Sequence, residues 1–270
     1  MKNIAVFFGG QSVEHDVSVI TGVLTLNALK KGYSVLPIFI DRGGEWYFGE
    51  NLLDVDFFKN INYKKLEKVT ILPWCNRLYK IKGKKHIPIC EISAVINCIH
   101  GERGEDGSLS GLLKLSGIPL ASPDLLPSSL FMDKHATKIF LKGLKIPTLS
   151  YQTASSVEDG LEATKQLGYP LVVKPKSGGS SIGVSTAKNE KELKKGLYTA
   201  LLYDEQVIIE PMLEDFIEIN HAVYRSGNQI VSSYLEQPLG KSGVLSFDDK
   251  YSVGKRIFPA KLDKKTRRKD

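Results

Sequence analysis

Short apolar runs alternate with stretches of helical periodicity along most of this chain. Strand-like runs occupy residues 3–10, 33–41, 94–101, 171–173 and 206–210. Because this alternation is typical of layered α/β proteins, it predicts an α/β architecture. Residues 41–92 mix strand fragments with several lysines and predict no clear order of elements.

The first predicted helix follows the first strand. Val17, Ile20, Leu24 and Ala28 recur at the spacing of one helical face, and Gly32 suits the end of the helix. The pattern therefore predicts an amphipathic helix directly after the first strand.

Three later helices have signals at their N-termini. Asp133 is placed to cap the first of them. Ser155 and Glu158 have the capping-box spacing ahead of the second. Asn189 and Glu192 start the third. One face of that third helix carries Leu193, Leu197 and Leu201.

The stretch VKPKSGGSSIGVS, residues 173–185, differs from a P-loop. In a P-loop the glycines precede Gly-Lys-Ser/Thr and a helix follows. Here Lys174 closes a strand, and a second extended run follows the Gly-Ser segment. The pattern predicts a strand–loop–strand unit with a flexible lid, and an ordinary Gly-Ser hairpin turn is the alternative.

Length and composition limit the class of protein. A length of 270 residues allows roughly two domains. No segment is long and apolar enough to span a membrane, and the N-terminus resembles a strand more than a signal peptide. Cys75, Cys90 and Cys98 lack CxxC spacing and indicate reduced thiols of a cytoplasmic protein.

The net charge does not favour nucleic acid as a partner. The last ten residues supply +4 of the total of +7, so the rest of the chain is close to neutral. No basic stripe with interleaved aromatic residues accompanies this basic run.

Two glycine-rich turns follow predicted strands in the first half of the chain. In GGQSVEHDVS, Gly9 and Gly10 leave the carboxyl end of a strand, where α/β proteins bind ligands. Glu14 is predicted in the first helical turn, either as a partner of the helix dipole or as a fixed anion for an ammonium-bearing substrate. In HGERGEDGSLSG, His100 precedes four glycines whose amides can approach a charged ligand. A structural role for His100 is the alternative, and no second ligand at metal-binding spacing accompanies it.

Three further charged residues lie beside predicted strand or helix ends. Lys134 and Lys174 are either surface charges or mobile point charges that bind phosphates. Glu210 closes a strand, where it would accept from a purine amine or simply face solvent.

Six stretches, in this order, resemble the D-alanine–D-alanine ligase family of the ATP-grasp fold. They are GGQSVEHDVS, HGERGEDGSLSG, MDK, VVKPKSGGSSIGVS, VIIEPML and FDDKYSVGKRIFPAKL. The resemblance covers essentially the whole chain and implies three domains, whose boundaries we place at changes of pattern near residues 122 and 206. These are a Rossmann-like parallel-sheet domain (residues 1–122), a central α+β lid domain (123–205) and a truncated C-terminal α+β domain (206–270).

The resemblance implies ATP-dependent ligation of two D-alanines through an acyl phosphate, for peptidoglycan precursor synthesis. Glu14 would hold the ammonium of the first D-alanine, in a hydrogen-bonded trio with Ser180 and Tyr251. His100 would lie near the carboxylate of this D-alanine, and Lys250 would help to neutralise the triphosphate. The other positions implied to bind ATP are Lys134, Lys174, Ser180, Ser181, Glu210, Pro211, Leu213 and Glu218.

The family also uses Mg²⁺, and its metal-binding carboxylates and asparagine belong to a segment that follows FPAKLDKK. These 270 residues contain no such segment, because the similar string EIN at residues 218–220 comes too early. We therefore assign no metal ligand. The family further implies a homodimer formed through the first domain.

Three alternatives remain on the sequence alone. The chain could be a non-catalytic nucleotide-binding remnant or inactive fragment, because the metal-binding segment is absent. It could also be a related ligase that joins D-alanine to another D-amino acid or hydroxy acid. A dinucleotide-dependent oxidoreductase would need a GxGxxG motif, which the first turn lacks.

Overall fold

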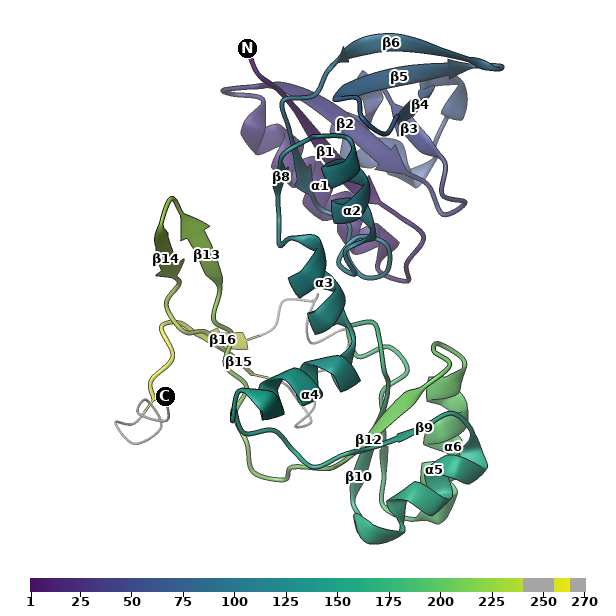
Figure 1. Ribbon diagram of the computed structural model, residues 1–270, viewed down its shortest axis with the longest axis vertical. Helices are drawn as coiled ribbons and strands as arrows, with labels where there is room; N and C mark the ends of the chain where they lie inside the picture. The colour runs from purple at the N-terminus through teal and green to yellow at the C-terminus, as the bar shows by residue number, and fades with distance from the viewer. Residues whose placement is uncertain (240–254, 263–270) are drawn as a thin grey trace. The chain divides into compact units, whose positions relative to one another are not determined.

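The computed structural model describes residues 1–239 and 255–262 of the chain. The chain divides into two compact units, residues 1–148 and 149–270, each with its own sheet and its own hydrophobic core (Figure 1). The three-domain division with boundaries after residues 122 and 205 stays a prediction. Strand β12 (Val207–Pro211), which follows the second predicted boundary, pairs within the sheet of the second unit.

The first unit is built on an eight-stranded sheet of order β6-β5-β4-β3-β2-β1-β7-β8 (Figure 1). The strands are β1 (Asn3–Gly9), β2 (Ser34–Ile40), β3 (Trp46–Phe48), β4 (Glu67–Ile71), β5 (Arg77–Lys82), β6 (Lys85–Glu91), β7 (Ala94–Asn97) and β8 (Leu120–Ala121). Strands β2, β1, β7 and β8 are parallel neighbours, so the predicted parallel core is confirmed.

Residues 41–92, for which the pattern predicted no order of elements, extend this core. Strands β3 to β6 add to the sheet as antiparallel neighbours. Three short 3-10 helices connect β3 to β4: η1 (Glu50–Leu53), η2 (Val55–Lys59) and η3 (Tyr63–Lys65).

Helices α1 (His15–Leu29) and α2 (Ser108–Leu115) cover opposite faces of this sheet. Because side chains alternate along a strand, neighbouring residues of β1 enter different core clusters. Phe7 packs in a cluster with Leu109 and Leu113 of α2, whereas Phe8 packs in a cluster with residues of α1. Helices α3 (Leu125–Met132) and α4 (Lys134–Gly143) complete the unit.

The face of α1 that packs on the sheet differs from the one that the apolar spacing indicated. Ser18 and Gly22 are buried, whereas Ile20 and Leu24 are 53% and 66% exposed. A Cβ atom on Gly22 would lie 2.3 Å from Cγ of Phe8, so α1 approaches β1 too closely for a larger side chain. The buried face therefore combines the small residues Ser18 and Gly22 with Val19, Val23 and Leu26, whereas Ile20 and Leu24 of the predicted face lie outside.

The second unit holds an antiparallel sheet of order β11-β10-β12-β9. Its strands are β9 (Gln152–Ala154), β10 (Leu171–Pro175), β11 (Ser185–Ala187) and β12. Helices α5 (Val157–Ala163) and α6 (Glu190–Leu201) pack on one face of this sheet, and the 3-10 helix η4 (Thr164–Gln166) follows α5. Two further antiparallel pairs are formed by β13 (Val223–Ser226) with β14 (Gln229–Ser232) and by β15 (Gln237–Leu239) with β16 (Lys255–Ile257).

Two of the three predicted helix starts are confirmed as they stand. The side chain of Asp133 accepts hydrogen bonds from the first turn of α4, and that of Asn189 accepts from the amide of Glu192 at 3.0 Å. The remaining start, that of α5, is shifted by one residue. Ser156, not Ser155, caps α5 by accepting from the amide of Asp159 at 3.0 Å.

The shift at α5 has a local cause. The carboxylate of Asp159 accepts from the amide of Ser155 at 2.9 Å, so Ser156 and Asp159 together satisfy amides on both sides of the helix start. The predicted pair Ser155 and Glu158 was therefore wrong by one position in the chain.

No helix among residues 1–239 and 255–262 is long and apolar enough to cross a membrane.

Candidate active site

Strand β1 ends in a turn that requires glycine. Gly9 has φ +86°, and a Cβ atom there would lie 2.2 Å from the carbonyl oxygen of Ile40. The amide of Gly10 donates to the same carbonyl at 2.8 Å. This close approach to the neighbouring strand turns the chain at the carboxyl edge of the sheet, where ligands bind in open α/β folds.

Glu14 lies buried at the end of this turn, with 5% of its surface exposed. It occupies the N-cap position of α1, one residue before the predicted place in the first helical turn, and its side chain makes no capping hydrogen bond. A Cβ atom on Gly101 would lie 2.8 Å from Oε2 of Glu14. The carboxylate therefore lies directly against the backbone that follows His100, so the structure brings the two predicted residues together.

His100 follows β7 by three residues and is held from two sides. Its carbonyl oxygen accepts from the hydroxyl of Ser12 at 2.6 Å, and its Nε2 lies 3.1 Å from Oγ1 of Thr21 on α1. Sequence reasoning singled out neither Ser12 nor Thr21. Their one signal is a hydroxyl near a glycine-rich turn, which does not identify a partner 79 or 88 residues away.

The loop after His100 is organised by its own carboxylates. Glu105 accepts from the amide of Gly101 at 2.7 Å. Asp106 accepts from the amides of Arg103 and Ser108 at 2.8 and 2.9 Å, respectively. From the sequence, only the glycines of this segment were expected to shape the loop, and the role of both carboxylates was missed. Their bonds hold the loop in one shape before any ligand binds.

A cavity of about 280 Å³ lies beside these two turns. Its lining residues are Gly10, Gln11, Ile40, Gly44, Trp46, Ile99, Arg103, Ser108, Leu109 and Leu112. The guanidinium of Arg103 donates to the amide oxygen of Gln11, which links the two glycine-rich turns at this cavity. The cavity thus adjoins the turns that carry Glu14 and His100.

In the second unit, residues 171–187 form the predicted strand–loop–strand unit. β10 pairs with β11 in antiparallel register, from Leu171 opposite Ala187 to Val173 opposite Ser185. In the loop between them, Ser180 and Ser181 have φ of +51° and +60°, the left-handed region that non-glycine residues rarely adopt. Strained backbone of this kind is common at ligand-binding loops, which favours the lid interpretation over an ordinary turn.

One carboxylate anchors the base of this loop. Asp204 accepts from the amide of Ser177 at 2.7 Å and from the amide of Gln206 at 3.1 Å. The amide of Lys176 also donates to the carbonyl oxygen of Gln206 at 3.0 Å. Sequence reasoning missed Asp204, because no motif marks an acidic residue 27 positions after Ser177.

Lys174 and Glu210 lie on the face of this sheet opposite α5 and α6. Val173 and Ile209 point toward the helices and are fully buried in their cluster, so the alternate residues of β10 and β12 face the other way. On that face the ammonium of Lys174 forms an ion pair with the carboxylate of Glu210. The structure thus brings together two residues that the sequence analysis considered separately.

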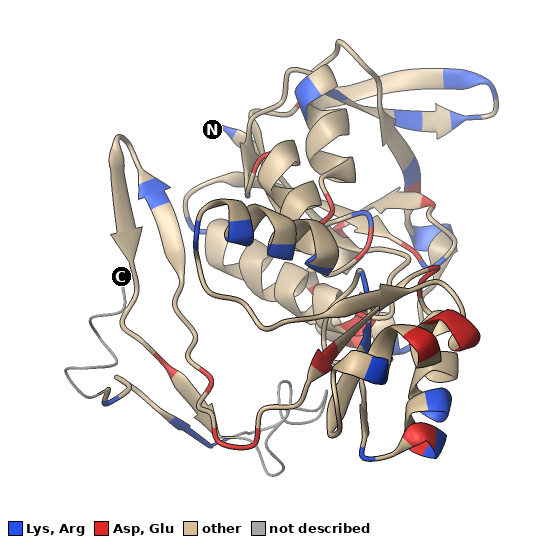
Figure 2. Ribbon diagram, turned by 60° about the horizontal axis from the view of Figure 1, so that its bottom comes forward, with Lys and Arg blue, Asp and Glu red and all other residues tan. Residues whose placement is uncertain are grey.

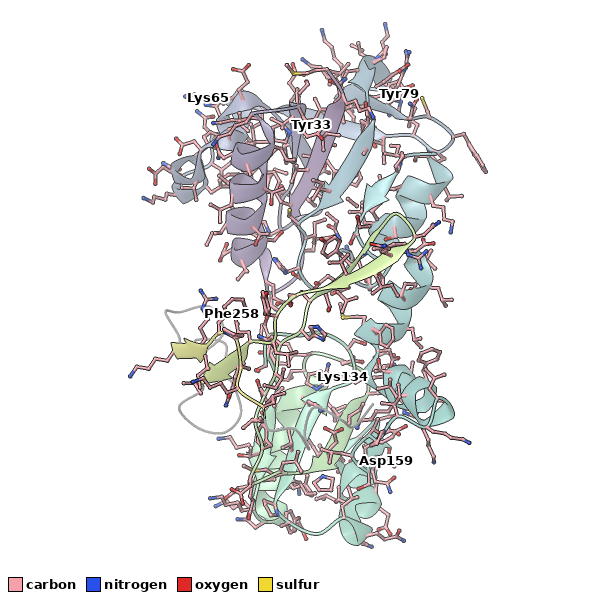
Figure 3. The ribbon with its side chains drawn as sticks, turned by 90° about the vertical axis from the view of Figure 1, so that its left-hand side faces the viewer. Tyr33, Lys65, Tyr79, Lys134, Asp159 and Phe258 are labelled. Carbon is pink, nitrogen blue, oxygen red and sulfur yellow. The ribbon has the colours of Figure 1, made fainter. Side chains whose placement is uncertain are left out.

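The remaining predicted residues are spread over other segments of the chain. Lys134 is the first residue of α4 in the first unit (Figure 3), Pro211 closes β12, and Leu213 is exposed just beyond it. Glu218 is half-buried on the chain that leads to β13. Lys250 and Tyr251 lie outside the described residues, so the predicted trio of Glu14, Ser180 and Tyr251 stays a prediction.

Lysine and arginine outnumber acidic residues along β4 to β6 (Figure 2), where Arg77 pairs with Glu91 and Lys80 pairs with Glu67. Within residues 1–239 and 255–262, no group of three or more His, Cys, Asp or Glu side chains could hold a metal ion.

A parallel α/β unit, followed by a four-stranded sheet with a glycine-rich lid, is the arrangement of ATP-grasp ligases. The family model of the D-ala D-ala ligase N-terminus matches residues 3–123, and that of the D-ala D-ala ligase C-terminus matches residues 140–269. The chain belongs to the D-alanine–D-alanine ligase family.

Individual relatives agree with this assignment. A D-alanine–D-alanine ligase from Thermosipho melanesiensis is 34% identical over 100% of this chain and 76% of the relative, and one from Wolinella succinogenes is 35% identical over 92% and 70%. The crystal structure of the Helicobacter pylori D-alanine–D-alanine ligase superposes with a TM-score of 0.78 at 32% identity, covering 88% of this chain and 72% of the other. The VanG D-Ala:D-Ser ligase of Enterococcus faecalis gives 0.80 at 28% identity, covering 98% and 78%.

Proposed function

We propose that this protein joins two D-alanines to D-alanyl-D-alanine in an ATP-dependent reaction, as a step of peptidoglycan precursor synthesis. The observation that carries the proposal is the buried carboxylate of Glu14 against the backbone of the His100 loop, at the carboxyl edge of the parallel sheet. A buried carboxylate beside a histidine suits a small zwitterion, because the two ends of an amino acid need an anion and a hydrogen-bond donor.

Glu14 would bind the ammonium of the first D-alanine, and His100 would lie at its carboxylate. Ser12 supports this assignment, because its hydroxyl donates to the carbonyl oxygen of His100 and accepts from the amide of Glu14 at 3.2 Å. One side chain thereby fixes the spacing between the two proposed binding groups. A site held at fixed spacing loses little entropy when a small substrate binds.

The lid and the sheet of the second unit would bind ATP. Lys174 would contact the phosphates, with Lys134, Lys250 and the backbone of Ser180 and Ser181 as further donors. The strained lid, anchored by Asp204, supports this role, because successive amides in such turns bind anions.

Glu210, Pro211, Leu213 and Glu218 would frame the adenine and ribose. Supporting this, Glu210 lies beside Lys174 on the same face of the sheet. Mg²⁺ would be the second cofactor, as the family implies, and the proposal assigns it no ligand because the described residues hold no group of three or more His, Cys, Asp or Glu side chains suited to a metal ion.

The reaction would proceed in two transfers. A carboxylate oxygen of the first D-alanine attacks the γ-phosphorus of ATP, and ADP leaves with the electron pair of the broken P–O bond. The amine of the second D-alanine then attacks the acyl carbon, loses a proton and displaces inorganic phosphate. Closure of the lid, with Ser180 and Tyr251 joined to Glu14, would keep water from the acyl phosphate.

The test is phosphate release by the 270-residue chain with ATP, magnesium and D-alanine, with L-alanine as the control. We expect D-alanine-dependent release that Lys174→Ala abolishes, and D-alanyl-D-alanine as the product by mass spectrometry. Binding of an ATP analogue without any D-alanine-dependent release would instead support a non-catalytic nucleotide-binding protein.

A related ligase with a different second substrate is the second candidate. The similarity to the VanG D-Ala:D-Ser ligase favours it. The same assay with D-alanine plus D-serine or D-lactate separates the two, because a mixed product would form in place of the D-alanine dimer.

We further propose a cytoplasmic homodimer formed through α1. The outward stripe of α1 is apolar, with Ile20 and Leu24 exposed and Val13 59% exposed ahead of the helix. Apolar residues that recur along one exposed helix face favour a protein partner over solvent. Three free cysteines fit a reducing compartment.

A further inference from the structure

The imidazole of His100 is held by a residue that the proposed mechanism does not use. Oγ1 of Thr21, on the second turn of α1, lies 3.1 Å from Nε2 of His100. The same hydroxyl donates to the carbonyl oxygen of Val17 at 3.0 Å. Within the described residues, Nδ1 of His100 makes no hydrogen bond.

A hydroxyl has one proton to donate and two lone pairs with which to accept. Because the proton of Thr21 is directed to Val17, Oγ1 is an acceptor toward His100, and Nε2 must carry the hydrogen. We propose that Thr21 is a positioning residue that fixes His100 as the Nε2–H tautomer and leaves Nδ1 as the ring nitrogen for a ligand.

The attachment of α1 makes this contact rigid. The amide of Gly9 donates to Oγ of Ser18 at 2.8 Å, and that hydroxyl donates to the carbonyl oxygen of Cys98 at 2.7 Å. Ser18 thereby ties the helix to the ends of both β1 and β7, three residues before Thr21. His100 follows Cys98 by two residues, so helix and loop cannot shift apart without breaking these bonds.

The backbone of His100 is fixed in addition to its ring. Ser12 donates to the carbonyl oxygen of His100, and Thr21 accepts from its ring. The hydroxyl from the turn therefore orients the backbone of His100, and the hydroxyl from α1 orients its imidazole. Threonine suits this position, because its branched Cβ limits the side chain to few rotamers in a helix and one of them permits the bond to Val17.

The consequence for substrate binding rests on the proposed function. With Nε2–H held by Thr21, Nδ1 is the nitrogen that meets the carboxylate of the first D-alanine, to which it donates when the ring carries both protons. Thr21 remains an acceptor in either protonation state, so the ring keeps one orientation throughout binding.

The first experiment is nitrogen NMR of the ¹⁵N-histidine-labelled chain in alkaline buffer, where imidazoles are neutral. The His100 signals are assigned by their loss in His100→Gln. We expect a single Nε2–H tautomer in the unsubstituted chain and a mixture of tautomers in Thr21→Val. Protonation at Nδ1 in the unsubstituted chain would overturn the proposal. This readout needs no turnover, so a lack of ligase activity counts against the proposed function alone.

The second experiment compares half-saturating D-alanine concentrations for three variants. Thr21→Val should raise the value by about 3- to 10-fold, the size expected for one lost hydrogen bond, with a smaller change in kcat. Thr21→Ser keeps the hydroxyl and should restore the original value. Thr25→Val, one helical turn further on, removes a hydroxyl that contacts Cys98 and should leave the value unchanged. Equal defects in Thr21→Val and Thr21→Ser would contradict the proposal, even if the valine variant folds poorly.

Discussion

The ammonium of Lys174 forms an ion pair with the carboxylate of Glu210 across two antiparallel strands, with 24% and 5% of the side chains exposed. Val172, not Lys174, is directly opposite Glu210, so the pair is diagonal on one face of the sheet. The proposed phosphate-binding and adenine-binding residues are therefore direct neighbours before nucleotide binds. This relationship has consequences for stability that can be measured without any activity.

Removal of Lys174 should destabilise the second unit. Lys174→Ala leaves the Glu210 carboxylate buried without the lysine charge, which we expect to cost about 1–3 kcal/mol of unfolding free energy after allowance for the exposed lysine. The double variant Lys174→Ala/Glu210→Gln should recover part of the loss. Urea denaturation of both single variants and the double variant measures the coupling. Strictly additive effects would show that the ion pair contributes nothing.

A surface pair provides the matched control for this measurement. Lys165 and Glu162 also form an ion pair, but both side chains are about two-thirds exposed or more. Lys165→Ala should therefore change the unfolding free energy by no more than about 0.5 kcal/mol.

The N-terminus of α5 offers a comparison between adjacent serines. Ser156→Ala removes the hydroxyl that accepts from the amide of Asp159, so it should cost about 1 kcal/mol. Ser155→Ala should be close to neutral, because Ser155 contributes its amide rather than its side chain. Thermal unfolding of the two variants decides between the two serines. A larger loss of stability for Ser155→Ala would show that Ser155 is the N-cap of α5, as the sequence indicated.

Gly9 should tolerate no side chain. Gly9→Ala places a methyl group against the carbonyl of Ile40 at a positive φ, which we expect to cost more than about 3 kcal/mol or to prevent folding. Gly32→Ala is the control, because no atom lies within 4 Å of its Cβ position. Circular dichroism on heating gives both values, and similar stability of the two variants would contradict the observed turn.

The thiol of Cys98 should react late with alkylating agents. Burial raises the pKa of Cys98, and its hydrogen bond to Thr25 offsets part of this effect. A raised pKa means that the thiolate forms only above the ordinary thiol range of about 8.5, so alkylation of Cys98 should rise with pH later in the folded chain than in the urea-unfolded chain. Mass spectrometry after iodoacetamide treatment across a pH series follows this site. Equal alkylation of Cys98 in the folded and unfolded chains at every pH would contradict the prediction.

The exposed stripe of α1 should control association. If the chain forms the proposed homodimer, Ile20→Glu with Leu24→Glu should convert it to a monomer by adding like charges to an apolar contact. Light scattering after size exclusion measures the mass of each variant. Leu202→Glu, an exposed leucine of the second unit, should leave the mass unchanged. A monomeric unsubstituted chain would refute the proposed dimer directly.

Much of the fold was predictable, because its signals are local in sequence. The strand–lid–strand unit follows from Lys174 at a strand end and the Gly-Ser run after it, and the structure has β10 and β11 in those places. Asp133 and Asn189 cap their helices as predicted, because an N-cap requires only one short polar side chain before a helical run. Residues 41–92 were not predictable, since their short strands depend on pairing with β2 and with one another.

By itself, the sequence determined the order of elements in the parallel core and in the strand–lid–strand unit, and the pair of glycine-rich turns that carry Glu14 and His100. Tertiary structure alone decided which face of α1 is buried, because the approach of the helix to Phe8 requires Gly22 there and leaves Ile20 outside. It also decided that Thr21 meets His100, 79 residues later in the chain. Periodicity and capping depend on residues a few positions apart, whereas the direction and partner of a side chain depend on which surfaces the whole sheet brings into contact.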